Sequence, residues 1–121
     1  MARKTLGMAL VGVGAAAQIN HIPALMKTDG VKLVALVDRD PEKAARVAQK
    51  FGVPFSFGRI EQMLERDDID AVDVCTPNFL HAPMAIASLE SGKHVLCERP
   101  LARNGDEAAA MAKAAKKADR V

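Results

Sequence analysis

The sequence predicts an α/β fold in which helices cover both faces of a doubly wound parallel sheet. Short apolar segments rich in Val, Leu and Ile alternate with longer helical patterns along the 121 residues, as parallel sheets require. A glycine-rich turn follows the first apolar segment. Glycine or polar residues end four of the expected strands, and in a parallel sheet these ends share the edge outside which ligands bind.

The expected elements follow one another without a linker or an internal repeat. Strands are expected at residues 6–12, 32–38, 54–57, 71–75 and 94–98. Helices are expected at residues 16–27, 41–51, 59–66, 80–91 and 105–118. Right-handed crossovers then give the strand order 3-2-1-4-5, and Arg120-Val121 resembles the start of a truncated sixth strand.

Residues at the helix ends support these boundaries. Asp40 can cap the helix that begins at Pro41, and Gly52 is suited to end it. Asn104 and Glu107 have the spacing of a capping box for the last helix.

The turn after the first strand has the spacing G-x-G-x-x-A of a dinucleotide-binding site. Gly12 allows a tight turn, Gly14 allows backbone to approach a pyrophosphate, and the small Ala17 allows close packing of helix on strand. The intervening Ala15 and Ala16 begin the helix, whose free N–H groups and positive dipole end favour an anion.

The end of the second strand supports the same interpretation. Asp38 follows Gly14 by 24 residues and can accept hydrogen bonds from the hydroxyls of an adenine ribose. Its alternative role is that of a capping acid before Pro41, which Asp40 fills better. Arg39 either stacks on adenine, neutralises a 2′-phosphate, or faces solvent. Asp38 therefore favours NAD, and Arg39 leaves NADP possible.

Composition excludes several classes of protein. Half of the residues are apolar, with four Phe and no Trp or Tyr, so we expect an aliphatic core. The net charge of +2 does not indicate a nucleic acid or membrane partner, and the Ala/Lys-rich last helix is better explained as a solvated amphipathic helix. No membrane span or secretory signal is apparent. Cys75 and Cys97 lack metal-site spacing, and we expect them to be buried and reduced in a cytoplasmic protein without a metal site.

Four motifs resemble the glucose–fructose oxidoreductase / inositol dehydrogenase / rhizopine-catabolism family of NAD(P)-dependent oxidoreductases. They are Gly12–Ala17 with His21, Val37–Asp40, Cys75–His81 and Gly92–Leu101. The resemblance implies a Rossmann-type fold and hydride transfer between nicotinamide and a sugar, polyol or related carbonyl compound. It covers the family's nucleotide-binding domain, which we expect to span residues 1–121, with the C-terminal substrate domain absent from this sequence.

The resemblance also implies residues on the nicotinamide side of the site. These are Thr76, Pro77, Asn78, His81, Glu98 and Arg99, with a cis bond before Pro100. Most have a plainer alternative: Thr76-Pro77-Asn78 as a turn from strand to helix with Asn78 as the cap, His81 as a surface or capping residue, and Glu98 as a charge at a strand end. His21 and His94 are interpreted as structural.

Arg99 stands where the family has a catalytic Lys. Arginine keeps the positive charge but cannot shuttle a proton at ordinary pH. Arg99 remains the candidate catalytic residue by its position, but its identity argues against ordinary catalysis by this family. Because the substrate domain is absent from this sequence, we expect this chain by itself to bind cofactor without turnover. The alternative is a truncated or engineered nucleotide-binding module that binds NAD(P) or merely folds. The fifth strand is expected to lie exposed at the sheet edge, which favours a homo-oligomer.

Overall fold

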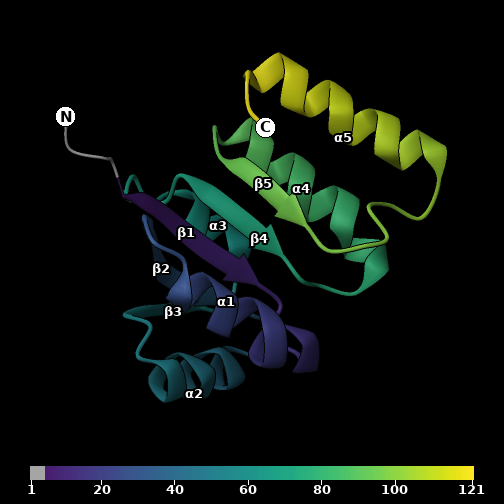
Figure 1. The fold of residues 1–121 in the computed structure, drawn as a ribbon. Coiled ribbons are helices and arrows are strands. Elements are labelled where there is room, and N and C mark those ends of the chain that lie inside the picture. The colour runs from purple at the N-terminus through teal and green to yellow at the C-terminus, as the bar shows by residue number, and fades with distance from the viewer. Residues whose placement is uncertain (1–4) are drawn as a thin grey trace.

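The computed structural model describes residues 5–121, which confirm the predicted fold class (Figure 1). All strands of the sheet run parallel in the order β3-β2-β1-β4-β5. Its strands are β1 (Leu6–Val11), β2 (Val31–Val37), β3 (Phe55–Phe57), β4 (Ala71–Val74) and β5 (His94–Cys97). Because the order reverses between β1 and β4, a crevice forms outside their carboxyl ends.

Helices cover both faces of the sheet. They are η1 (Ala17–His21, a π-helical turn), α1 (Ile22–Lys27), α2 (Pro41–Phe51), α3 (Ile60–Leu64), η2 (Asn78–Leu80, a 3₁₀ turn), α4 (His81–Glu90) and α5 (Gly105–Ala118). One aliphatic cluster joins the sheet to α1 and α2, and another joins it to α3. Leu10 belongs to the first cluster, whereas its neighbours Ala9 and Val11 belong to the second, as the alternation of side chains along a strand requires.

The expected helix at residues 16–27 contains an unexpected π-helical turn. The turn spans Ala17–His21 and ends just before Pro23, which occupies the first turn of α1. A proline inside an α-helix lacks an N–H donor and clashes with the carbonyl group four residues earlier. The turn is closed by a hydrogen bond from Ile22 N–H to the carbonyl oxygen of Ala17, and Pro23, which has no N–H group, follows it directly.

Most of the expected caps are present. The Asp40 side chain accepts a hydrogen bond from Lys43 N–H, and the Asn104 side chain accepts one from Glu107 N–H. Gly52 ends α2 with φ of +72°. The alternative role of Asn78 as a helix cap is wrong: Pro77 occupies the cap position of η2, and no side chain caps either η2 or α4.

The edge strand β5 has a partner for part of its length, because Val95 N–H donates to the carbonyl oxygen of Val121 at 2.8 Å. This contact lies where a sixth strand was expected to start, but Arg120 and Val121 form no strand. Cys75 and Cys97 are half-buried rather than buried, since both lie where the strands end. No helix within residues 5–121 is long and apolar enough to cross a membrane.

Candidate functional site

A crevice of about 610 Å³ lies outside the carboxyl ends of β1, β2 and β4. Its lining combines the glycine turn, the residues after β2 and the turn after β4. Among the site residues predicted from the sequence, those that line it are Gly12, Gly14, Ala15, Ala16, Ala17, Asp38, Arg39, Thr76 and Pro77.

The floor of the crevice is anchored by backbone hydrogen bonds just beyond the strands. Gly12 N–H donates to Val37 O at 2.8 Å, and Asp38 N–H donates to Phe57 O at 3.1 Å. On the other side, Cys75 N–H donates to Val11 O at 2.8 Å. Each of these residues was expected to end a strand. Each instead keeps one sheet bond through its N–H group and leads the chain into the crevice.

The two fingerprint glycines have different surroundings. Gly12 has φ of +94°, and a Cβ atom there would lie 2.8 Å from the backbone of Cys75 and Thr76. Gly14 is open: a Cβ atom would meet nothing within 4 Å, and the residue lines the crevice. Gly12 is therefore required for packing of the turn on β4, whereas Gly14 leaves space beside the crevice.

Asp38 connects the end of β2 to the glycine turn. Its Oδ2 accepts a hydrogen bond from Val13 N–H at 3.0 Å, and its Oδ1 accepts one from Asp40 N–H at 2.9 Å. A carboxylate has about four acceptor positions, so two remain for a ligand in the crevice. Asp40, not Asp38, caps α2, which separates the two roles considered for these acids.

Basic side chains lie at the same end of the crevice as Asp38. Arg39, Lys43 and Arg59 line it, and Arg59 is 3.6 Å from the Glu61 carboxylate. Sequence reasoning missed Lys43 and Arg59. The signal was available for Lys43, because its N–H group is capped by Asp40 and this places it at the start of α2. Arg59 lies here only because β3 pairs with β2.

The crevice contains groups that fit a dinucleotide. Within the described residues, the hydroxyl oxygen of Thr76 is buried without a hydrogen-bond partner. Thr76 itself lines the crevice together with Gly14 and Asp38. A buried polar atom without a partner costs free energy unless a ligand or water satisfies it. The available acceptors and donors suit ribose hydroxyls and a pyrophosphate.

Four predicted residues lie outside the crevice lining: Asn78, His81, Glu98 and Arg99. His81 is 1% exposed, so the alternative of a surface residue is wrong. Its Nδ1 bonds to Pro100 O at 2.7 Å and its Nε2 to Thr76 O at 2.8 Å. His81 thus links the turns after β4 and β5. The expected cis bond between Arg99 and Pro100 is present.

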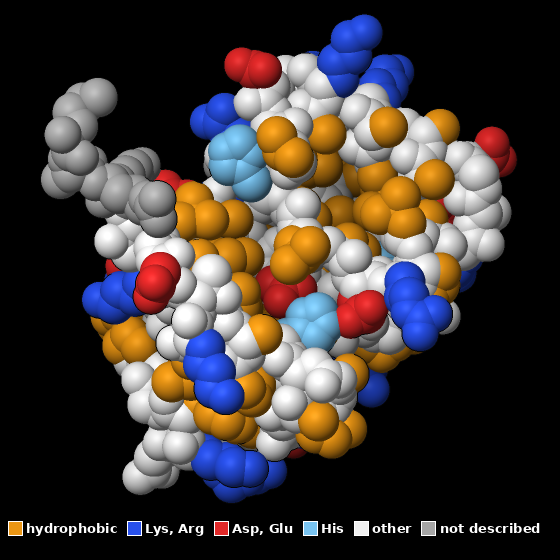
Figure 2. Space-filling view, in the orientation of Figure 1, with side chains coloured by type: hydrophobic (Ala, Val, Ile, Leu, Met, Phe, Trp, Pro, Cys, Tyr) orange, Lys and Arg blue, Asp and Glu red, His pale blue; other side chains and the backbone are white. Residues whose placement is uncertain are grey.

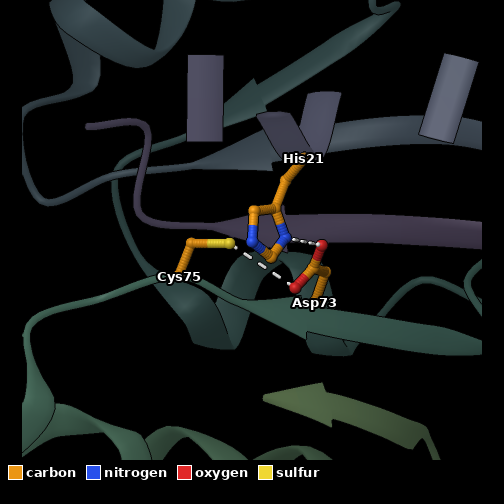
Figure 3. A group of neighbouring side chains, drawn as sticks. All are labelled: His21, Asp73 and Cys75. Carbon is orange, nitrogen blue, oxygen red and sulfur yellow. Dashed lines mark hydrogen bonds and ion pairs between the residues drawn. The ribbon is translucent and has the colours of Figure 1, made fainter. Parts of the chain in front are cut away.

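His21, predicted to be structural, lies between two carboxylates. Its Nδ1 bonds to Asp73 Oδ2 at 2.7 Å, and its Nε2 bonds to Glu98 Oε2. Asp73 is 0% exposed and also accepts a hydrogen bond from Cys75 Sγ at 3.4 Å (Figure 3). Sequence reasoning missed Asp73, although a charged residue inside an apolar strand signals a buried partner.

The charges in this cluster set the protonation of its members. Burial opposes the charge of His21, but the hydrogen bonds and charges of Asp73 and Glu98 outweigh it and raise its pKa above 6.5. The hydrogen bond from His21 lowers the pKa of Glu98. Burial, with Asp73 nearby, raises the pKa of the Cys75 thiol and raises that of Cys97 to about 11. Both thiols therefore stay protonated at neutral pH.

The side chains of His21, Asp73 and Cys75 converge closely enough to be compared with a metal site. Ligand bonds of about 2.0 Å in a tetrahedral zinc site place neighbouring ligand atoms about 3.3 Å apart. The His21 and Asp73 atoms are 2.7 Å apart, which is the distance of a shared proton. We therefore interpret the cluster as a hydrogen-bonded charge network.

Comparison with known proteins identifies the fold family. The chain is 43% identical over 106 residues to 4-carboxy-2-hydroxymuconate-6-semialdehyde dehydrogenase of Sphingobium sp., covering 88% of this chain and 33% of that protein. It is 46% identical over 81 residues to levoglucosan dehydrogenase of Pseudarthrobacter phenanthrenivorans, covering 67% of this chain and 21% of that protein. The chain thus spans a third or less of the length of these relatives.

Solved structures of related proteins have the same fold as this chain. The 3-ketoreductase KijD10 of Actinomadura kijaniata, solved with NADP and TDP-benzene, superposes with a TM-score of 0.92 at 30% identity, covering 98% of this chain and 37% of that chain. The WlbA dehydrogenase of Chromobacterium violaceum, solved with NADH and UDP-GlcNAcA, has a TM-score of 0.89 at 35% identity, covering 98% and 34%. Residues 6–121 match the oxidoreductase family with an NAD-binding Rossmann fold. The chain therefore belongs to the glucose–fructose oxidoreductase / inositol dehydrogenase / rhizopine-catabolism family.

Proposed function

We propose that this chain forms the cofactor-binding part of an NAD(P)-dependent oxidoreductase that acts on a sugar, polyol or related carbonyl compound. The observation that carries the proposal is the position of Asp38 beside the Gly12–Ala17 turn in the crevice, where its carboxylate accepts a hydrogen bond from Val13 N–H at 3.0 Å. This arrangement suits a ribose at one side and a pyrophosphate at the other. Relatives that include a levoglucosan dehydrogenase and a 3-ketoreductase support the substrate class.

In this proposal the chain's own residues bind and orient the cofactor. Asp38 accepts hydrogen bonds from the adenine ribose, and the Gly14 turn faces the pyrophosphate. Thr76 and Pro77 line the side of the crevice that follows β4. The buried hydroxyl group of Thr76 has no hydrogen-bond partner among the described residues, and the cofactor supplies one. The bound nicotinamide supplies the hydride chemistry. Exposed Arg99 offers a permanent charge for binding but no proton transfer.

The proposed cofactor is NAD rather than NADP, because the Asp38 carboxylate repels a 2′-phosphate. Arg39, Lys43 and Arg59 lie close enough to line the same end and leave NADP as the second candidate. We propose that the substrate is bound with groups beyond these residues, so that the chain alone binds cofactor without turnover.

A titration with NADH and NADPH tests this proposal. Because the chain has no Trp or Tyr, reduced-nicotinamide fluorescence is measured with little background. Asp38→Asn is expected to weaken NADH binding about tenfold, the effect of losing a hydrogen bond to a charged group, and to weaken NADPH binding less. Asp29→Asn, an exposed acid in the turn before β2, is the matched control. Failure of the wild-type chain to bind either cofactor contradicts the proposal.

We also propose that copies of the chain associate through the β5 side in the cytoplasm, where the thiols stay reduced. Figure 2 shows hydrophobic side chains gathered over this side of the molecule. Leu96 on β5 and Leu101 after it are 53% and 52% exposed. Light scattering is expected to give a dimer, and Leu96→Lys is expected to shift the population to monomer. A wild-type monomer at high concentration contradicts this.

A further inference from the structure

A network of charged side chains that the proposed function leaves unused lies at the ends of β4 and β5. Buried Asp73 contacts His21, and His21 contacts Glu98 on its other side. His21 comes from the π-helical turn η1, and such turns occur frequently at functional sites. The network therefore joins three segments that are distant in sequence.

The Asp73 carboxylate explains why a positive charge lies here. A carboxylate removed from water is costly unless a hydrogen-bonded partner compensates it, and Asp73 is 0% exposed. Among residues 5–121, His21 is the one basic side chain paired with it. His21 therefore carries two protons while it bridges Asp73 and Glu98, because both of its ring nitrogens face acceptors.

Glu98 connects His21 to the turn that follows β5. Its Oε2 bonds to His21, and its Oε1 accepts a hydrogen bond from Arg99 N–H at 2.9 Å. The carbonyl of Pro100 is held separately by His81. The turn Glu98–Pro100 is thus held at both ends by histidines: His21 bonds to Glu98, and His81 bonds to the carbonyl oxygen of Pro100.

From this geometry we infer that His21 is a positioning residue, which holds Glu98 and through it the Arg99 turn beside the nicotinamide end of the crevice. The inference rests on the proposed function. Its consequence is that His21 affects recognition of the nicotinamide half of the cofactor and leaves the adenine half untouched, because Asp38 and Gly14 bind the adenine half without it.

Comparison of NADH with ADP-ribose tests this inference on the chain itself. ADP-ribose keeps the adenosine and both phosphates but lacks nicotinamide. His21→Gln and Glu98→Ala are each expected to weaken NADH binding about threefold to tenfold while ADP-ribose affinity stays unchanged. The double variant is expected to be no weaker than either single variant, because both remove one connection. His94→Gln is the matched control, since His94 contacts Val121 N–H.

The pH profile separates positioning from a merely structural role. The pKa of His21 lies above 6.5. NADH affinity is expected to fall as the pH rises through this pKa, whereas ADP-ribose affinity is expected to stay constant over the same range. Glu98→Gln keeps an acceptor for Arg99 N–H and is expected to rescue the loss seen in Glu98→Ala, without the pH dependence. The groups that face His21 or flank Glu98 in this network are Asp73, Cys75, Cys97 and Arg99.

An NMR titration without ligand provides a second measurement. The Arg99 amide resonance is expected to shift with the His21 ring resonances in the wild type and to lose this response in Glu98→Ala. Two results overturn the inference. One is an equal loss of NADH and ADP-ribose binding in His21→Gln or Glu98→Ala. The other is an Arg99 amide resonance that does not shift when the His21 ring resonances shift. If the wild type binds neither cofactor, the proposed function fails, and the Arg99 titration alone decides whether His21 positions the turn.

Discussion

Gly12→Ala is expected to lower the free energy of unfolding by about 2–5 kcal/mol, from left-handed backbone strain together with overpacking. The added Cβ atom would lie 2.8 Å from backbone atoms of Cys75 and Thr76, and the residue has φ of +94°. Backbone atoms cannot move aside as a flexible side chain can. The turn would have to move away from β4. The contact between the turn and β4 lies where the strand order reverses, and the crevice depends on it.

Gly14→Ala is the matched comparison because the two glycines are two residues apart. Its Cβ atom meets nothing within 4 Å, so the free energy of unfolding should change by less than about 0.5 kcal/mol. The methyl group enters space beside the crevice, and NADH affinity is expected to fall at least about tenfold.

Urea unfolding followed by circular dichroism measures the stability of both variants, and nicotinamide fluorescence measures binding. Equal destabilisation by both substitutions would contradict the assignment of separate roles to the two glycines. Unchanged NADH affinity in a well-folded Gly14→Ala chain would show that the pyrophosphate lies elsewhere.

His21→Leu is expected to lower the free energy of unfolding by about 3 kcal/mol at pH 6, the lower end of the range for breaking a buried ion pair. The lower end applies because the His21 side chain is 16% exposed, whereas that of Asp73 is 1% exposed. The substitution leaves the Asp73 carboxylate buried without its cation. Adding Asp73→Asn to His21→Leu is expected to recover part of the loss, since it removes the uncompensated charge.

The contribution of His21 depends on pH in a defined direction. Its pKa is raised in the folded state, so its stabilisation is fully present below the unfolded value of 6.5 and is lost as pH rises through the folded pKa. The pKa of Glu98 is lowered, so its contribution is present above 4.5 and is lost as pH falls through the folded pKa. Both contributions are therefore present between about pH 4.5 and 6.5.

Unfolding free energies of the wild type and His21→Gln, measured from pH 5 to pH 9, check this direction. The difference between the two proteins is expected to shrink as pH rises above 6.5. A difference that is constant across this range, or that grows with pH, would contradict a protonated His21 in the folded state.

Much of the fold could be predicted because its signals are local. The apolar segments, the cap at Asp40 and the glycine at position 52 each act on residues within one helical turn. The strand order followed from the alternation of strands and helices together with the handedness of crossovers. The π-helical turn at Ala17–His21 was not predicted, although Pro23 carries a local signal for it.

The sequence by itself determined the parallel sheet, the glycine turn and the acid at the end of β2, because spacing along the chain places each of them. Only the tertiary structure decided that His21 meets Asp73 and Glu98, which are 52 and 77 residues away. The same holds for Arg59, which lines the crevice together with Asp38. Contacts of this kind depend on strand register and on the direction of a helix turn, and neither is set by the residues that make the contact.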